Sequence, residues 1–214
     1  MTHGAVEAEL KYTASDERPL LELEGAPRLG PARLGAPRAT HELDRYLDTA
    51  DLRLSAVHWA CRLRQREGRT ILSLKGPPQH GAADILHRRE ELEGTGGAGL
   101  DPLTWPESPA RDLLAALTGG GELVERFRLD QDRTERSVSV GEMPVGVLSL
   151  DRVRVIYRDD EAGRMYVVEL ELDAAALAVG LNHRPLADAL GRVSGLSPDP
   201  LSKLQRALAL IPAP

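Results

Sequence analysis

The sequence is poor in the residues that build disulfide, thiolate or histidine metal sites. Its 214 residues include one cysteine, Cys61, and six scattered histidines. A single cysteine forms neither an internal disulfide nor a Cys-x-x-Cys metal site, which favours a reducing compartment. The histidines lack the His-x-x-x-His spacing of a helical zinc site. We therefore do not expect a histidine or thiolate metal centre.

Long apolar runs and an excess of positive charge are also missing. No stretch approaches 18 apolar residues, and the N-terminus lacks a basic region followed by an apolar one, so we expect no membrane span, no signal peptide and a cytoplasmic location. The formal net charge of −6 argues against a nucleic-acid partner. With 42% hydrophobic residues but only 3% aromatic ones, the chain can bury a core filled mainly by Leu, Val and Ala. We expect one domain over 1–214.

Period-two alternation of apolar and polar residues dominates the chain. Few helices are predicted between the strands: one at 108–118, and a helical C-terminal part over 174–211 with one break. Residues 24–39 are rich in Gly and Pro and predict a flexible loop insertion. This pattern indicates a mainly β (α+β) fold, an antiparallel sheet closed into a barrel with flanking helices. The predicted strands are 5–13, 41–49, 57–68, 69–78, 84–94, 121–141, 144–157 and 163–173.

Charged residues recur on one face of these strands. Glu7, Glu9 and Lys11 share a face of the first strand, and Glu169 and Glu171 share a face near the other end of the chain. For any one strand, contact with solvent explains such a face. The whole set is better explained by a charged barrel interior, since clustered carboxylates repel unless a cation lies among them. Oxygen-only ligands suit Mg²⁺ or Mn²⁺, and arginines clamp phosphate oxygens.

Several short motifs carry a resemblance to a known family. "EAELK" (7–11) matches an ExExK signature, and further matches follow in the family's order. The chain resembles the CYTH superfamily, also called triphosphate tunnel metalloenzymes, over roughly residues 5–208. The resemblance implies an eight-stranded antiparallel β-barrel that forms a tunnel and hydrolyses triphosphates. The further matches are "YLDT" (46–49), "CRLRQ" (61–65), "LSLKGP" (72–77), "RREELE" (88–93), "QDR" (131–133), "LSLD" (148–151), "VELEL" (168–172) and "SKLQRAL" (202–208).

The resemblance also implies roles for individual residues. The implied metal ligands, for Mg²⁺ or Mn²⁺, are Glu7, Glu9, Glu169 and Glu171, with Asp151 as a further candidate, and the four glutamates together with Lys11 form the implied catalytic set. Register leaves open whether Arg88 replaces Arg89, and whether Arg126 and Arg128 face inward. The implied triphosphate contacts are Lys11, Arg62, Arg64, Lys75, Arg89, Arg133 and Lys203, and Glu91 matches another acidic position on the tunnel wall.

The predicted function is divalent-metal-dependent hydrolysis of a small triphosphate or polyphosphate, most simply inorganic tripolyphosphate to pyrophosphate and phosphate. Thiamine triphosphatases of this family carry a tryptophan where this chain has Ala60, and Trp59 is predicted to point to the opposite face. Three alternatives stay open: a class IV-like adenylyl cyclase, a thiamine triphosphatase, and a polyphosphate-binding module without turnover.

Overall fold

Eight long antiparallel strands form a closed barrel in the computed structural model, which describes residues 5–79 and 86–212. The strands follow the order β8-β4-β5-β6-β7-β1-β10-β9, and a β8–β9 pairing closes the ring. This confirms the predicted fold; residues 84 and 85 of one predicted strand lie outside the described residues. The barrel strands are β1 (Ala5–Ala14), β4 (Arg38–Thr49), β5 (Ala60–Arg66), β6 (Arg69–Pro78), β7 (Leu86–Thr95), β8 (Leu123–Val140), β9 (Met143–Tyr157) and β10 (Asp160–Leu172).

Tight turns set the register of the hairpins. The β5–β6 turn lies at Glu67 and Gly68, as predicted, with φ values of 49° and 75°. The β9–β10 turn uses only Arg158 and Asp159, with φ values of 50° and 69°, and is shorter than the predicted turn over 158–163. Positive φ at both central residues matches the twist of two-residue hairpins. Since register decides which side chains face inward, these turns help to position the site.

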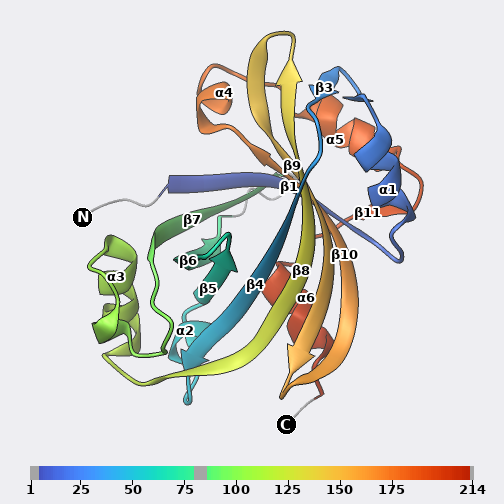
Figure 1. The fold of residues 1–214 in the computed structure, drawn as a ribbon. Coiled ribbons are helices and arrows are strands. Elements are labelled where there is room, and N and C mark those ends of the chain that lie inside the picture. Colours follow the sequence, from blue (N-terminus) through green and yellow to red (C-terminus); the bar gives the residue numbers. More distant parts are fainter. Residues whose placement is uncertain (1–4, 80–85, 213–214) are drawn as a thin grey trace.

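The outer face of the barrel is apolar on the two sides where helices cover it. Outward residues of β1, β9 and β10 pack under α1 (Arg18–Gly25), α4 (Ala174–Ala178) and α5 (Arg184–Gly191). Outward residues of β5, β6 and β7 pack under α2 (Arg53–Ala56) and α3 (Pro109–Thr118), on the other side of the barrel (Figure 1). A short 3-10 turn, Pro102–Thr104, precedes α3. This covered exterior lets the inner face be polar.

One end of the barrel interior is closed by α6 (Lys203–Leu210). Ala207 is fully buried and packs with Phe127 of β8, Val155 of β9 and Met165 of β10. Ser202 caps the helix in a reciprocal capping box with Gln205. The C-terminal part is interrupted twice, at 179–183 and 192–202, and not once as predicted; the second gap includes β11 (Leu196–Pro198), which pairs with β1.

The loop prediction for 24–39 is wrong for part of that segment. β2 (Arg28–Leu29) and β3 (Ala32–Leu34) form a small hairpin, and β3 extends the sheet at β8. Gly30, at φ 55°, makes the turn that the Gly- and Pro-rich composition suggested only as a loop. The Arg136 guanidinium donates to the carbonyl oxygens of Leu23, Ala26 and Gly35. These tertiary contacts outweigh the local composition. None of the described helices is long and apolar enough to span a membrane.

Candidate active site

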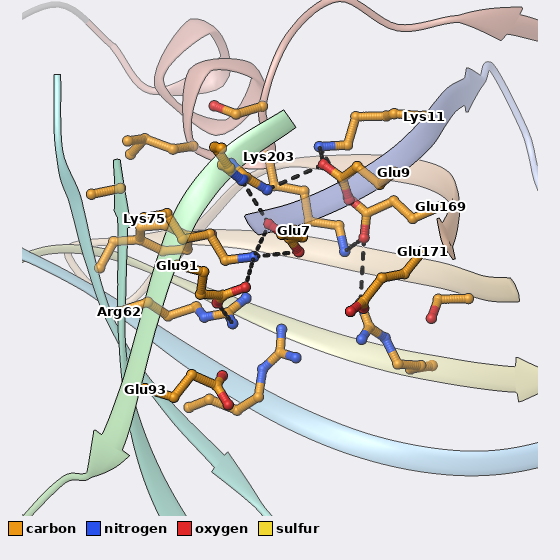
Figure 2. Close-up of a pocket in the computed structure, with 18 residues that line it drawn as sticks. Glu7, Glu9, Lys11, Arg62, Lys75, Glu91, Glu93, Glu169, Glu171 and Lys203 are labelled. Carbon is orange, nitrogen blue, oxygen red and sulfur yellow. Dashed lines mark hydrogen bonds and ion pairs between the residues drawn. The ribbon is translucent and has the colours of Figure 1, made fainter. Parts of the chain in front are cut away.

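A cavity of about 230 Å³ lies inside the barrel. Twelve of the thirteen predicted site residues line it, and they come from β1, β5, β6, β7, β8, β10 and α6. Figure 2 shows the labelled glutamates and lysines pointing toward one another from these strands and from α6. The predicted residues on the wall are Glu7, Glu9, Lys11, Arg62, Arg64, Lys75, Arg89, Glu91, Arg133, Glu169, Glu171 and Lys203.

The pairing of β1 explains how residues from the two ends of the chain meet. In the β1–β10 register Glu9 lies opposite Glu171 and Lys11 opposite Glu169. On the other side of β1, Glu7 lies opposite Arg89 of β7. Residues directly opposite on one face are close neighbours across a sheet. The two Glu-x-Glu segments therefore form one continuous acidic strip.

Glu7 is neutralised by two cations of the wall. Lys75 Nζ lies 2.8 Å from Glu7 Oε1, and Arg89 Nε lies 2.8 Å from Glu7 Oε2. Burial alone would raise the pKa of Glu7, but Lys75 and Arg89 outweigh it and lower the pKa to about 2. Burial lowers the pKa of Lys75, and the nearby Arg89 and Arg62 lower it further. Glu7 is therefore ionised, and Lys75 lies among competing cations.

Glu169 is the centre of a second ion-paired group. Its carboxylate lies 3.0 Å from Lys11 Nζ and 2.7 Å from Lys203 Nζ. Burial opposes its ionisation, but Lys203, Lys11 and Arg133 outweigh burial and hold its pKa well below the usual range. Burial likewise opposes the charge of Lys11, while Glu169 and Glu9 raise the Lys11 pKa. The wall thus carries fixed charges of both signs at short range.

Glu171 and Glu91 differ from the other wall carboxylates. Burial raises the pKa of both, and the neighbouring Glu7 raises each of them further. No hydrogen bond or ion pair joins the Glu171 side chain to another described residue. Glu91 contacts Lys75 at 3.2 Å, but its other oxygen, Oε1, is buried without a hydrogen bond. At these two carboxylates, burial and the neighbouring glutamates outweigh the effect of the nearby cations.

Three carboxylates lie behind the wall and have no exposed surface: Glu42, Asp44 and Asp151. Asp151 does not line the cavity, so the geometry does not support its prediction as a metal ligand. Its oxygens accept hydrogen bonds from Arg133 at 2.7 and 2.9 Å and from Lys203 at 2.5 Å. Burial raises the pKa of Asp151, but Arg133 and Lys203 outweigh it and lower the pKa. Both oxygens are already occupied by cations of the wall.

The donor set on the wall suits a divalent metal chemically. Glu7, Glu9, Glu169 and Glu171 offer only carboxylate oxygens, the ligands that Mg²⁺ and Mn²⁺ prefer. A cation would also relieve the repulsion at Glu171. Within residues 5–79 and 86–212, no three His, Cys, Asp or Glu side chains are already grouped to hold a metal ion. Metal binding would therefore require Glu7, Glu9 and Glu169 to exchange lysine and arginine partners for the ion.

The structure resolves the open questions of register. Arg89 lines the cavity, whereas Arg88 lies on the exposed face of β7. Arg126 and Arg128 flank the buried Phe127 and do not line the cavity. Trp59 packs with the core under α3, as predicted from its phase.

Sequence reasoning missed two residues of β4. Tyr46 lines the cavity and stacks on Phe127, with ring centroids 4.8 Å apart. Asp44 lies behind two arginines of the wall. Both lie on the same face of β4 as Glu42, two and four residues further along, and this alternation in the sequence could have indicated that they point inward. Glu93, Ser149 and Ser202 also line the cavity.

The chain matches the model of the CYTH domain over residues 5–178. It is 27% identical to the "Putative triphosphatase YjbK" of Bacillus subtilis (strain 168) over 137 residues, which are 64% of this chain and 63% of the relative. The chain thus spans under two thirds of the length of the curated relative that it matches.

Solved structures share the fold at low sequence identity. The "putative adenylyl cyclase HpAC1" from Hippeastrum, described with a dominant triphosphatase activity, has a TM-score of 0.66 and 20% identity, covering 97% of this chain and 98% of its own. A "putative adenylate cyclase" from Bacillus halodurans has a TM-score of 0.59 and 19% identity, covering 94% and 97%.

Proposed function

Because the chain belongs to the CYTH domain family, we propose that it hydrolyses a triphosphate with the help of a divalent metal ion, and that inorganic tripolyphosphate is the substrate. The observation that carries the proposal is the convergence of seven lysines and arginines and six glutamates on one cavity of about 230 Å³. Cations attract a polyphosphate, and carboxylates attract the metal that accompanies it. Phosphoryl transfer needs chiefly positioning and charge neutralisation.

The proposed triphosphate contacts are the cations of the wall. Arg62 supports this assignment, because its side chain is only 10% exposed and its buried Nε has no hydrogen-bond partner. An unpaired buried donor is costly unless an acceptor reaches it. Lys203 at the start of α6 and Arg133 of β8 approach from another side. Arginine forks and lysine ammonium groups together would hold the phosphate oxygens in one orientation.

The proposed metal ligands are Glu7, Glu9, Glu169 and Glu171, with Mg²⁺ or Mn²⁺ as the ion. When bound, such an ion would neutralise charge on the phosphoryl oxygens and favour attack by water. The glutamates would hold the ion, and the lysines and arginines paired with them would then be available to the substrate. The raised pKa of Glu171 supports its place in this set, since a bound cation would offset the burial and the neighbouring Glu7 that raise it.

Tripolyphosphate is favoured over substrates that carry an aromatic ring. Ala60 lies on the cavity wall, and Trp59 packs on the opposite face of the strand. Tyr46 is the one aromatic residue among the described lining residues, and its ring already stacks on Phe127. The triphosphatase activity stated for HpAC1 and the name of YjbK also support hydrolysis over cyclisation.

The test is phosphate release from tripolyphosphate, ATP and thiamine triphosphate, each with Mg²⁺, Mn²⁺ or a chelator. We expect metal-dependent release, fastest from tripolyphosphate. Thiamine triphosphate as the best substrate would overturn the substrate choice, and cyclic AMP with pyrophosphate from ATP would identify a cyclase. Tight binding of polyphosphate without release from any substrate would identify a binding module. Glu169→Ala, which removes a proposed ligand, should abolish metal-dependent release.

A further inference from the structure

Asp44 of β4 lies directly behind two arginines of the cavity wall. Arg64 forms a two-pronged contact with it, Nε to Oδ1 and Nη2 to Oδ2, both at 2.7 Å. Arg62 Nη1 lies 3.5 Å from Oδ2 of the same carboxylate. Both arginines line the cavity, whereas Asp44 does not line it and has no exposed surface. One buried carboxylate thus contacts two neighbouring cations of the wall.

A further buried layer holds Asp44 in turn. Gln131 Nε2 donates to Asp44 Oδ2 at 3.2 Å and to Glu42 Oε2 at 2.7 Å. Glu42 also lies 3.1 Å from Arg64 Nη1. Glu42 and Gln131 have no exposed surface. The Arg64 guanidinium is therefore contacted on three nitrogens by groups that have little freedom to move.

We propose that Asp44 is a positioning residue, which fixes the guanidinium planes of Arg62 and Arg64 in the orientation that receives phosphate oxygens. The proposal rests on the proposed function of the same cavity. A planar guanidinium binds phosphate through parallel N–H groups, so its orientation matters as much as its charge. A partner that holds the plane in advance lowers the entropy lost when the anion binds.

Charge alone would make the loss of Asp44 strengthen anion binding, whereas positioning makes it weaken binding. Asp44 is negative, so its removal makes the region around Arg62 and Arg64 more positive and would strengthen the attraction for an anion. Positioning predicts weaker binding when the carboxylate is lost. Loss of an outer partner of a ligand-holding side chain costs roughly tenfold or more in affinity at metal centres. We expect an effect of that order in Asp44→Asn, because the amide keeps one acceptor oxygen and Arg64 loses one of its two 2.7 Å contacts.

The experiment is calorimetric binding of tripolyphosphate, with and without Mg²⁺, to the unmodified protein, Asp44→Asn and Asp44→Glu. Asp44→Glu keeps the charge but moves the carboxylate, so positioning predicts weaker binding in both variants, by about tenfold in Asp44→Asn. Asp48→Asn is the matched control. Asp48 is a buried carboxylate of the same strand, but its oxygens accept from Thr49, Leu54 and Ser55 and contact no cation of the wall. It should lose stability and keep its affinity.

Arg64→Lys provides a second measurement if Asp44→Asn does not fold. Asp44 is proposed to act through the guanidinium of Arg64, which Arg64→Lys removes. Asp44→Glu should therefore weaken binding much less in the Arg64→Lys protein than in the otherwise unmodified protein. Unchanged or tighter binding by Asp44→Asn, or equal effects of Asp44→Glu in both backgrounds, would overturn the inference. Binding without phosphate release would overturn only the proposed hydrolysis. No binding by the unmodified protein would overturn both.

Discussion

Glu171 of β10 and Asp151 of β9 are both carboxylates on neighbouring strands of the barrel, yet their surroundings are opposite. Glu171 faces the cavity, pairs with no described cation, and has a raised pKa through burial and the nearby Glu7. Asp151 has no exposed surface, contacts Arg133 and Lys203, and has a lowered pKa. Carboxylates of the first kind are available to a ligand, whereas those of the second kind hold the cations that would bind one.

Asp151→Asn should have the largest effect of these variants, a loss of unfolding free energy. The change removes a fully buried carboxylate partner of Arg133 and Lys203, which then keep Glu169 and, for Arg133, the more distant Glu42. Breaking a buried pair costs about 3–5 kcal/mol of unfolding free energy. Urea unfolding measures this directly. An unfolding free energy equal to that of the unmodified protein would show that Asp151 does not hold these cations.

Glu171→Gln should reduce metal-dependent phosphate release by about a hundredfold, the upper end of the loss seen around metal sites, while stability changes little. The Glu171 side chain has no ion pair with a described residue to lose. Phosphate release and thermal unfolding are measured on the same sample. Glu161→Gln, an exposed change on the same strand, is the matched control and should alter neither. Large destabilisation by Glu171→Gln would place Glu171 with the buried carboxylates.

The loss of unfolding free energy at acidic pH should depend on Glu7 but not on Glu171. The folded-state pKa of Glu7 is lowered to about 2 from 4.5. Its stabilising contribution is therefore complete above pH 4.5 and is lost as pH falls toward 2, which amounts to about 3 kcal/mol.

Glu171 has a raised pKa, so its linkage has the opposite sign, and the folded state gains relative stability as Glu171 takes up its proton. Unfolding free energies between pH 5 and 2 test both residues. Glu7→Gln should flatten the loss of stability on acidification, and Glu171→Gln should not. Equal slopes in the two variants would contradict the difference between their surroundings.

Cys61→Ala should have the smallest effect. Cys61 is 1% exposed and packs outward beneath α3, between the inward-facing Ala60 and Arg62. Losing the sulfur should cost about 1 kcal/mol of unfolding free energy. Phosphate release should stay unchanged. A kinetic effect would mean that the outer wall of the barrel is coupled to the cavity.

The period-two pattern made most of the barrel predictable. Strand positions and the inward phase of Glu7, Glu9, Arg62, Arg64 and Lys75 follow from alternation, because the apolar face of β1, β5 and β6 packs under helices. The hairpin β2–β3 was not predictable, because tertiary contacts of β8 and Arg136 outweigh a Gly- and Pro-rich composition. The helix α1 was likewise not predicted.

The difference between Glu171 and Asp151 required the structure. Alternation places a carboxylate on a face, but it does not say whether a cation from another strand already contacts that carboxylate. Arg133 and Lys203 reach Asp151 only because β8 and β9 pair in one register and α6 closes the barrel end beside them. Asp44 was missed for the same reason, since its arginine partners lie on the next strand.

The sequence by itself determined the charged and apolar faces of the strands, because side-chain alternation is a local property of an extended backbone. The tertiary structure decided which of those charges face the cavity and which neutralise one another behind its wall. That division depends on strand order, register and the position of α6. Each pairing contributes to stability because a buried charge without a partner is costly.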